Sequence, residues 1–188
     1  MIAAMETAPA LFPNLLGLRA WRNLPETVRR MHGDTPRVFA QGVADVDGSS
    51  HPLARLLRRL LGLPPPGMQQ AVDVCIERQG TRETWTRRFA LGQMRSTLHA
   101  DAQGKHLLER LGPITLRFAL HPDAHGIPWH VDRAWLLGVR VPTAWLGKVM
   151  SRSGERQGRY AFDIDTQLPW IGRLVAYHGW LEIVADDG

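Results

Sequence analysis

The chain has 188 residues, of which 44% are hydrophobic and 22% charged, a composition typical of a globular domain. Its single cysteine, Cys75, leaves no partner for an intrachain disulfide, so a disulfide-stapled scaffold is excluded, as are a collagen-like fibre and a disordered chain. The formal net charge is +5, and nearly all of the positive charge is arginine, scattered along the sequence. Nucleic-acid binding is therefore not expected.

The first residues have no basic segment, and Glu6 and Pro9 interrupt any apolar run, which argues against a secretory signal. No run of about 18 apolar residues occurs, so no transmembrane segment is expected. With the lone cysteine, these features predict a cytoplasmic protein. Neither a repeat nor a linker is visible, so residues 1–188 are expected to form a single domain.

Residues 1–69 are predicted to be rich in helices, with one strand. Asn23 and Glu26 have the spacing of a capping box, which predicts a helix from there to Met31. Residues 37–46 alternate between apolar and polar and predict a strand.

The segment 53–61 is the clearest helix in the sequence. Its apolar face consists of Leu53, Leu56, Leu57 and Leu60, and its basic face of Arg55, Arg58 and Arg59. Two interpretations remain open. The leucines pack on a sheet while the arginines lie in water, or this basic amphipathic helix binds an anionic membrane or a protein partner.

From residue 70 to residue 188 the period changes from 3.6 to 2, which predicts an antiparallel meander because the connections are short. Strands are expected at 72–76, 81–91, 94–99, 116–120, 127–137, 159–165 and 174–184. Residues 107–111 are predicted to form a helical turn, 139–146 an edge strand or turn, and 151–158 a mobile loop. Within the last strand, Gly179 indicates a bulge or a close backbone approach.

This order of elements predicts an α+β fold. The expected architecture is a strongly curved antiparallel sheet, a half-barrel of about 7–8 strands, packed against two or three helices from the amino-terminal third. The concave face of such a sheet has to be filled by the helices or by a hydrophobic ligand.

Residues 81–91 suggest a binding site, because Glu83, Trp85 and Arg87 share one face of the strand. If that face points inward, Arg87 can bind an anionic head group while Trp85 covers an apolar tail. Otherwise the charged side chains sit at the rim and reach solvent. The full set of candidate ligand-binding residues is Glu83, Trp85, Arg87, Arg117, Trp135 and His178.

Arg117, His178 and the pair Asp163 and Asp165 each lie opposite an apolar face, which favours exposure to solvent. A histidine and aspartate cluster comprises His121, Asp123, His125, His130 and Asp132. It fits no metal-binding signature, so no metal site is predicted. Phosphate loops, dinucleotide fingerprints, nucleophile elbows and Cys–His pairs do not occur, so no cofactor is expected and the catalytic residues stay unassigned.

Six segments, in this order, carry a resemblance: 11–17 (LFPNLLG), 24–32 (LPETVRRMH), 53–66, 85–89 (WTRRF), 109–113 (ERLGP) and 168–181. They resemble a bacterial family of domains of unknown function. Members of that family occur alone or carboxyl-terminal to saccharopine-dehydrogenase-like or epimerase-like nucleotide-binding domains, so the resemblance implies a nucleotide-binding protein as a partner. It supplies no catalytic residue.

Three hypotheses of function follow. The first is a module that binds a small hydrophobic or amphipathic ligand in the trough of the sheet. The second is an enzyme of isomerase or hydrolase type that acts on a similar ligand through Glu83, Asp163 or His178. The third is an interaction domain that docks a nucleotide-binding partner through the arginines of the segment 53–61.

Overall fold

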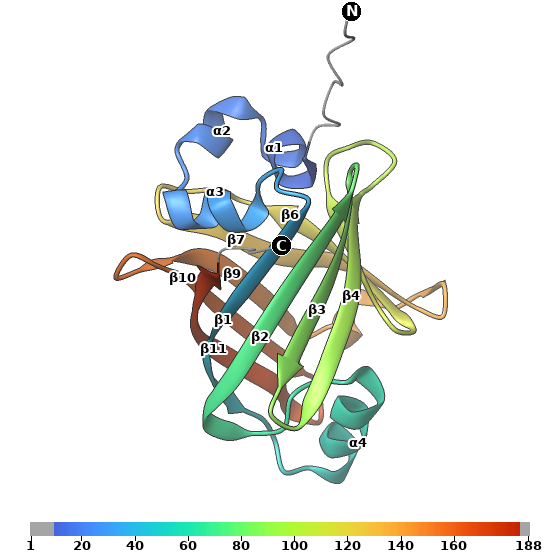
Figure 1. The fold of residues 1–188 in the computed structure, drawn as a ribbon. Helices are drawn as coiled ribbons and strands as arrows, with labels where there is room; N and C mark the ends of the chain where they lie inside the picture. The colour runs from blue at the N-terminus through green and yellow to red at the C-terminus, as the bar shows by residue number, and fades with distance from the viewer. Residues whose placement is uncertain (1–9, 185–188) are drawn as a thin grey trace, which may run out of the picture.

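The computed structural model describes residues 10–184, and the strands of this region form one antiparallel sheet (Figure 1). Along the sheet the order is β6-β5-β4-β3-β2-β1-β11-β10-β9-β7-β8, and a further pairing of β6 with β7 closes ten of these strands into a barrel. The strands are β1 Arg37–Asp47, β2 Gly67–Gln79, β3 Arg82–Phe89, β4 Gly92–Ala100, β5 Leu107–Leu111, β6 Ile114–Leu120, β7 Gly126–Leu136, β8 Val139–Arg140, β9 Lys148–Arg156, β10 Arg159–Leu168 and β11 Gly172–Val184. The amino-terminal residues 1–6, where a secretory signal is not expected, lie outside the described residues.

The predicted α+β half-barrel of 7–8 strands is wrong. Strands account for 57% of the chain and helices for 17%, and the barrel is closed. Two strands escaped sequence reasoning, β5 where a helical turn was expected and β9 where a loop was expected over 151–158. β5 joins β6 to β4, and β9 joins β7 to β10, so these two strands attach the β6–β7 hairpin to both sides of the sheet. Because these two strands were not predicted from the sequence, the closed barrel was predicted as an open, curved sheet.

Both missed strands have weak sequence patterns. In β5 the apolar residues Leu107, Leu108 and Leu111 follow a helical spacing, and β9 is mostly polar. Their backbones are nevertheless paired on both sides, since each lies between two other strands. Cross-strand hydrogen bonding therefore determined these elements, whereas local propensity did not.

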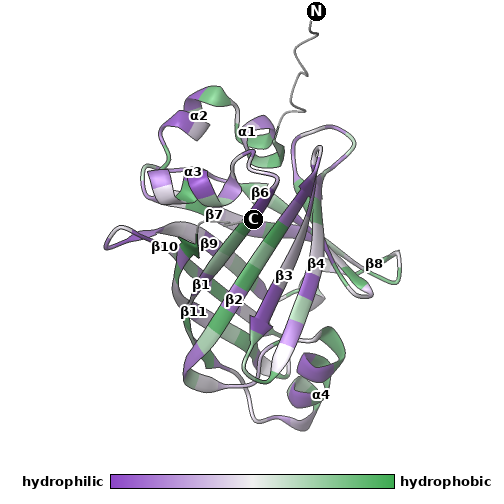
Figure 2. Cartoon of the chain, viewed as in Figure 1, coloured by the Kyte–Doolittle hydropathy of each residue, from purple (hydrophilic) through white to green (hydrophobic). Residues whose placement is uncertain are grey.

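The remaining strand predictions are confirmed in kind. Most of these strands extend beyond the predicted bounds, but β3 is shorter, β7 is shifted by one residue, and within 139–146 the strand is confined to Val139–Arg140. Gly179 is confirmed as a close backbone approach, because a Cβ there would lie 2.0 Å from the carbonyl oxygen of Val43 on β1. On the other strand, a Cβ on Gly42 would lie 1.9 Å from the oxygen of Trp180. These two glycines allow β1 and β11 to pass each other without side chains in the way. Figure 2 shows how apolar and polar residues alternate along such strands.

Helices cover the two ends of the barrel. α1 (Leu11–Leu16), α2 (Leu18–Arg22) and α3 (Glu26–His32) lie together at one end, and α4 (Pro52–Leu61) lies at the other (Figure 1). The short helix η1 (Thr143–Trp145) follows β8. Asn23 does not cap α3 as predicted; it ends α2, and Pro25 precedes α3. Among the described residues, none of the helices combines the length and the apolar character needed to cross a bilayer.

The helix α4 begins after His51, whose ring Nδ1 accepts a hydrogen bond from the backbone N–H of Leu53, and it ends at Gly62 in a left-handed conformation. The interpretation in which the leucines pack on the sheet and the arginines lie in water is wrong for Leu53, Leu56 and Leu60, which are exposed, and for Arg58. Arg58 is buried, and its Nη1 donates to the carbonyl oxygen of Leu174 on β11 at 2.9 Å. This bond and the buried Ala54 hold α4 against the barrel.

Candidate ligand-binding site

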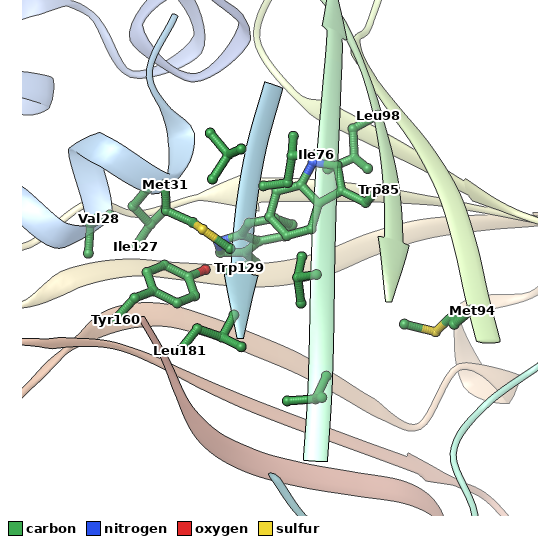
Figure 3. Packing of buried hydrophobic residues seen from close by; sticks show 14 of the residues in the cluster. Val28, Met31, Ile76, Trp85, Met94, Leu98, Ile127, Trp129, Tyr160 and Leu181 are labelled. Carbon is green, nitrogen blue, oxygen red and sulfur yellow. The ribbon is translucent and has the colours of Figure 1, made fainter. Parts of the chain in front are cut away.

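The end of the barrel beneath α3 is filled with aromatic side chains. The ring of His32 lies 4.2 Å from that of Phe12 and 5.3 Å from that of Trp85, measured between centroids. Trp129 and Tyr160 complete this group, which we call the aromatic plug. Figure 3 shows Trp85, Trp129 and Tyr160 gathered near α3. The plug seals this end because α3 inserts its last turn into the barrel.

A polar network runs through the plug. The Nε2 atom of His32 lies 3.1 Å from the hydroxyl of Tyr160 and 3.3 Å from that of Ser153, and Tyr160 donates to Ser153 at 2.8 Å. Burial lowers the pKa of His32 well below its ordinary value, and the charges of Arg78 and Arg87 lower it further, so the ring is neutral. Nδ1 of this ring has no partner among the described residues. Without a carboxylate on that atom, the network lacks the arrangement of a catalytic triad.

Glu83 belongs to the same end. Its carboxylate accepts from Arg78 Nε at 3.0 Å and from the indole N–H of Trp85 at 2.8 Å. Arg78 also donates to the carbonyl oxygens of Met31 and Thr35, both at 2.6 Å. Burial raises the pKa of Glu83, and the guanidinium of Arg78 opposes this rise. The pair thus ties α3 to β2 and β3, and Glu83 does not line the cavity described next.

Between the plug and α4 the barrel is hollow. The cavity measures about 470 Å³. Its floor is formed by plug residues such as Trp85, Trp129 and Tyr160, and Leu57 and Leu61 of α4 line it at the opposite end. The walls are mainly apolar and are lined by Val72, Val74, Phe89, Met94, Leu111, Ile114, Leu116, Phe118, Ala134, Trp135, Phe162, Ile164, Leu168, Leu174 and Val175.

One ion pair interrupts this apolar wall. Arg87 on β3 donates from Nη2 to the carboxylate of Glu109 on β5 at 3.4 Å and from Nη1 to the hydroxyl of Ser96 at 3.0 Å. Its guanidinium carbon also lies 4.8 Å from the centre of the Trp85 ring. The side chains of Arg87 and Glu109 are only 12% and 15% exposed, so both charges are held inside the barrel. The Nε of Arg87 has no hydrogen-bond acceptor among the described residues.

Tyr177 on β11 adds a hydroxyl to the same cavity. The residue is buried, and its ring packs against Phe89 and Phe162 at centroid distances of 5.9 and 6.0 Å. Burial raises the pKa of Tyr177, so the hydroxyl stays protonated at neutral pH. It has no hydrogen-bond partner in the part of the chain that the structure describes, although a buried tyrosine hydroxyl usually finds one.

The structure separates the six residues predicted to bind a ligand. Trp85, Arg87 and Trp135 line the cavity. Glu83 is inside the barrel but belongs to the helix-covered end. Arg117 and His178 lie on the outer surface, because the strand alternation turns their neighbours Phe118 and Tyr177 inward.

Both outward residues have acidic neighbours. The Nε of Arg117 donates to Asp132 at 2.8 Å, and the ring of His178 lies 3.8 Å from a carboxylate oxygen of Asp45. Asp163 is the partner of His178 across β10 and β11, so these two candidates for catalysis also face outward, away from Glu83. The three residues of the enzymatic hypothesis therefore do not converge on one cavity.

The histidine and aspartate cluster of residues 121–132 comes together only in part: the rings of His121 and His130 lie 5.1 Å apart, whereas the two aspartates bind arginines. Asp123 binds Arg152 at 2.9 Å and the backbone N–H of His125 at 2.7 Å, and Asp132 binds Arg117. Within residues 10–184, no three His, Cys, Asp or Glu side chains come close enough to share a metal ion.

Sequence reasoning missed Glu109 and Tyr177. Glu109 lies in the segment expected to form a helical turn, so its inward orientation was not visible. Tyr177 could have been found, since it alternates with His178, for which exposure was the favoured interpretation. Both residues become candidates for ligand binding only because they line the same cavity as Arg87, which lies on another strand.

Comparisons with known proteins give the following. No curated protein matches the chain. Among solved structures, the dehydratase domain from the CurF module of the curacin polyketide synthase aligns over 94% of this chain and 84% of that one, at 9% identity and a TM-score of 0.17, a score from which no shared fold is inferred. A family model matches residues 24–181, which is most of the chain. The protein therefore belongs to the family described as a domain of unknown function, DUF4166.

Proposed function

We propose that this domain binds one amphipathic molecule inside the barrel, with the apolar part against the walls and the polar part at Arg87, Glu109 and Tyr177. The observation that carries the proposal is a cavity of about 470 Å³ whose apolar walls contain one buried ion pair. Small-molecule sites usually have such a volume and combine mostly apolar walls with a few convergent polar groups.

The polar groups define the head group. Arg87 Nε and the hydroxyl of Tyr177 are free to donate, and the carboxylate of Glu109 is free to accept on its second oxygen. A ligand carboxylate or carbonyl satisfies the two donors, and a ligand hydroxyl can also donate to Glu109. A ligand without oxygen leaves these groups without partners. Because an unpaired polar group is costly inside an apolar site, such a ligand should bind more weakly.

An apolar tail fits the rest of the cavity. Leucine, phenylalanine and tryptophan side chains from β3, β6, β7 and β10 surround the space between the ion pair and α4. Each methylene moved from water to this environment contributes about 0.8 kcal/mol. Affinity should therefore rise with chain length until the tail reaches α4.

Competition for a fluorescent probe tests the proposal. Purified protein is first loaded with 1-anilinonaphthalene-8-sulfonate, and dodecanoic acid and 1-dodecanol are then titrated as competitors. We expect both to displace the probe, the acid more strongly. Native mass spectrometry of gently purified protein should show a bound small molecule. Failure of both compounds to displace the probe, together with a ligand-free mass, contradicts the proposal.

Two variants locate the binding. Ala134 is 2% exposed and lines the cavity, so Ala134→Phe fills it and should weaken the binding of both compounds. The matched control is Ala119→Phe, which lies next to the inward-facing Phe118 and therefore projects outward. Equal effects of the two variants would place the binding elsewhere.

The role of Arg87 is tested by the double variant Arg87→Met with Glu109→Gln, which removes both charges together and leaves neither unpaired. We expect it to bind dodecanol normally and to lose the preference for dodecanoic acid. A preserved preference contradicts the assignment of Arg87 to the head group.

Three predictions from the sequence accompany this proposal: the protein is bacterial, it is cytoplasmic, and it has a nucleotide-binding partner. A barrel that carries an amphipathic substrate or product would serve such a partner by holding an apolar molecule out of water.

A further inference from the structure

The exposed apolar side chains of the barrel are concentrated at one end. Of the thirteen large apolar residues that are exposed among those described, all except Leu18 and Val184 belong to the end that α4 covers. The most exposed are Trp170 at 83%, Leu91 at 81% and Leu137 at 79%, each at the tip of a different hairpin. Such a concentration at one end points to an interaction surface, whereas apolar residues scattered singly over the whole surface need no explanation.

The helix α4 contributes a row of leucines to this end. Leu53, Leu56 and Leu60 are 45%, 51% and 69% exposed, while Leu57 and Leu61 on the other side of the helix line the cavity. One of the two interpretations of the sequence placed Leu53, Leu56, Leu57 and Leu60 against a sheet. The buried Arg58 instead rotates the helix so that apolar side chains face both the cavity and the outside.

Two of the exposed tips have an unfavourable backbone. Leu137 and Trp170 have φ values of 52° and 67°, a left-handed conformation that side chains rarely adopt. Glycine or asparagine would occupy these turn positions at a lower cost. Both turns therefore place a bulky apolar side chain in solvent at an unfavourable backbone conformation, where it is open to a contact outside the chain.

The charge around these tips is positive. Arg55, Arg59, Arg140 and Lys148 are exposed and form no ion pair with another described residue. The acidic side chains Asp47 and Asp165 at the same end are both bound by Arg173, at 2.7 and 3.3 Å.

We infer that the α4 end docks on an anionic phospholipid bilayer, with the apolar tips inserted among the acyl chains and the basic side chains on the lipid head groups. The apolar side chains lie on three separate hairpins and on α4, an arrangement that a fluid bilayer can accommodate. An exposed tryptophan is also typical of proteins at the membrane interface. The inner leucines of α4 line the cavity directly behind this surface, so docking places the ligand site against the bilayer. That consequence rests on the proposed function, whereas docking itself does not.

Vesicle sedimentation tests the inference. Full-length protein is mixed with vesicles of phosphatidylcholine alone or of phosphatidylcholine with phosphatidylglycerol. We expect binding to the anionic vesicles, weakened by salt, and a blue shift of tryptophan emission. The variant Leu60→Ser with Trp170→Ser should bind at least tenfold more weakly, and Arg55→Gln with Arg59→Gln up to about 30-fold more weakly, since each cation contributes roughly fivefold. Leu18→Ser, at the opposite end, should bind like the unchanged protein.

Several outcomes overturn the inference: no binding to anionic vesicles, an equal loss in Leu18→Ser, or a shift from dimer to monomer in the Leu60 and Trp170 variant, which would assign the surface to a second copy. Thermal unfolding of each variant shows that it is folded. Displacement of the fluorescent probe by dodecanoic acid, measured without vesicles, separates the two proposals. Docking that fails while dodecanoic acid still binds overturns only the membrane surface, and docking by a protein that binds no ligand overturns only the proposed function.

Discussion

The interior of the barrel is filled differently at its two ends. At the α3 end, the interior is closed by the chain itself, with Phe12 and His32 reaching into the strands and Glu83 neutralised by Arg78. At the α4 end the interior is left hollow, with an ion pair exposed to the cavity and apolar side chains outside. Packed rings and a buried ion pair are thus concentrated at the α3 end, whereas the α4 end keeps the space that a ligand can occupy.

The largest expected effect concerns the closed end. Arg78→Met leaves the carboxylate of Glu83 buried without its cation and removes two hydrogen bonds to the α3 region. We expect the free energy of unfolding to fall by about 3–5 kcal/mol, measured by chemical denaturation. Arg82→Met, at an exposed position on β3, serves as the control and should change it little. A small effect of Arg78→Met would show that this end is not anchored by the ion pair.

A pair of truncations compares the two ends directly. Phe12→Ala removes a fully buried ring from the plug and should cost about 3–5 kcal/mol. Phe162→Ala removes a partly buried ring that already faces the cavity, so its loss should cost about 2 kcal/mol or less. Denaturation of both variants measures the difference, and equal costs would contradict the contrast between a packed end and a hollow one.

Acid should weaken the closed end through His32. In the unfolded chain this histidine binds a proton below about pH 6.5, whereas burial keeps it neutral in the fold. The unfolded state therefore binds more protons, and the free energy of unfolding falls as the pH drops below that value. His32→Gln should make this fall shallower. Burial also lowers the pKa of His99, so part of the slope remains.

The smallest effect is expected outside the hollow end. Leu60→Ser with Trp170→Ser should change the free energy of unfolding by no more than about 0.5 kcal/mol, since both side chains face solvent. A large destabilisation, detected by thermal unfolding, would mean that these residues belong to the core and not to a binding surface.

The candidate site was only half visible in the sequence. Trp85 and Arg87 could be assigned to one face of a strand because strand alternation is a local property, but whether that face points inward stayed open. Glu109 and Tyr177 could not be connected with them, since Glu109 contacts Arg87 from β5 and Tyr177 lines the same cavity from β11, through pairings between distant segments. The orientation of α4 was also hidden, because Arg58 turns inward only where the carbonyl oxygen of Leu174 is available.

By itself, the sequence determined most strands, the positions of α3 and α4, and the close approach at Gly179, because periodicity and glycine act within a few residues. Closure of the barrel was decided by the tertiary structure alone. β5 and β9 become strands because a neighbouring strand on each side supplies hydrogen bonds, a condition that no local pattern records. The cavity follows from that closure, since a ring of ten strands encloses more volume than the helix at one end can fill.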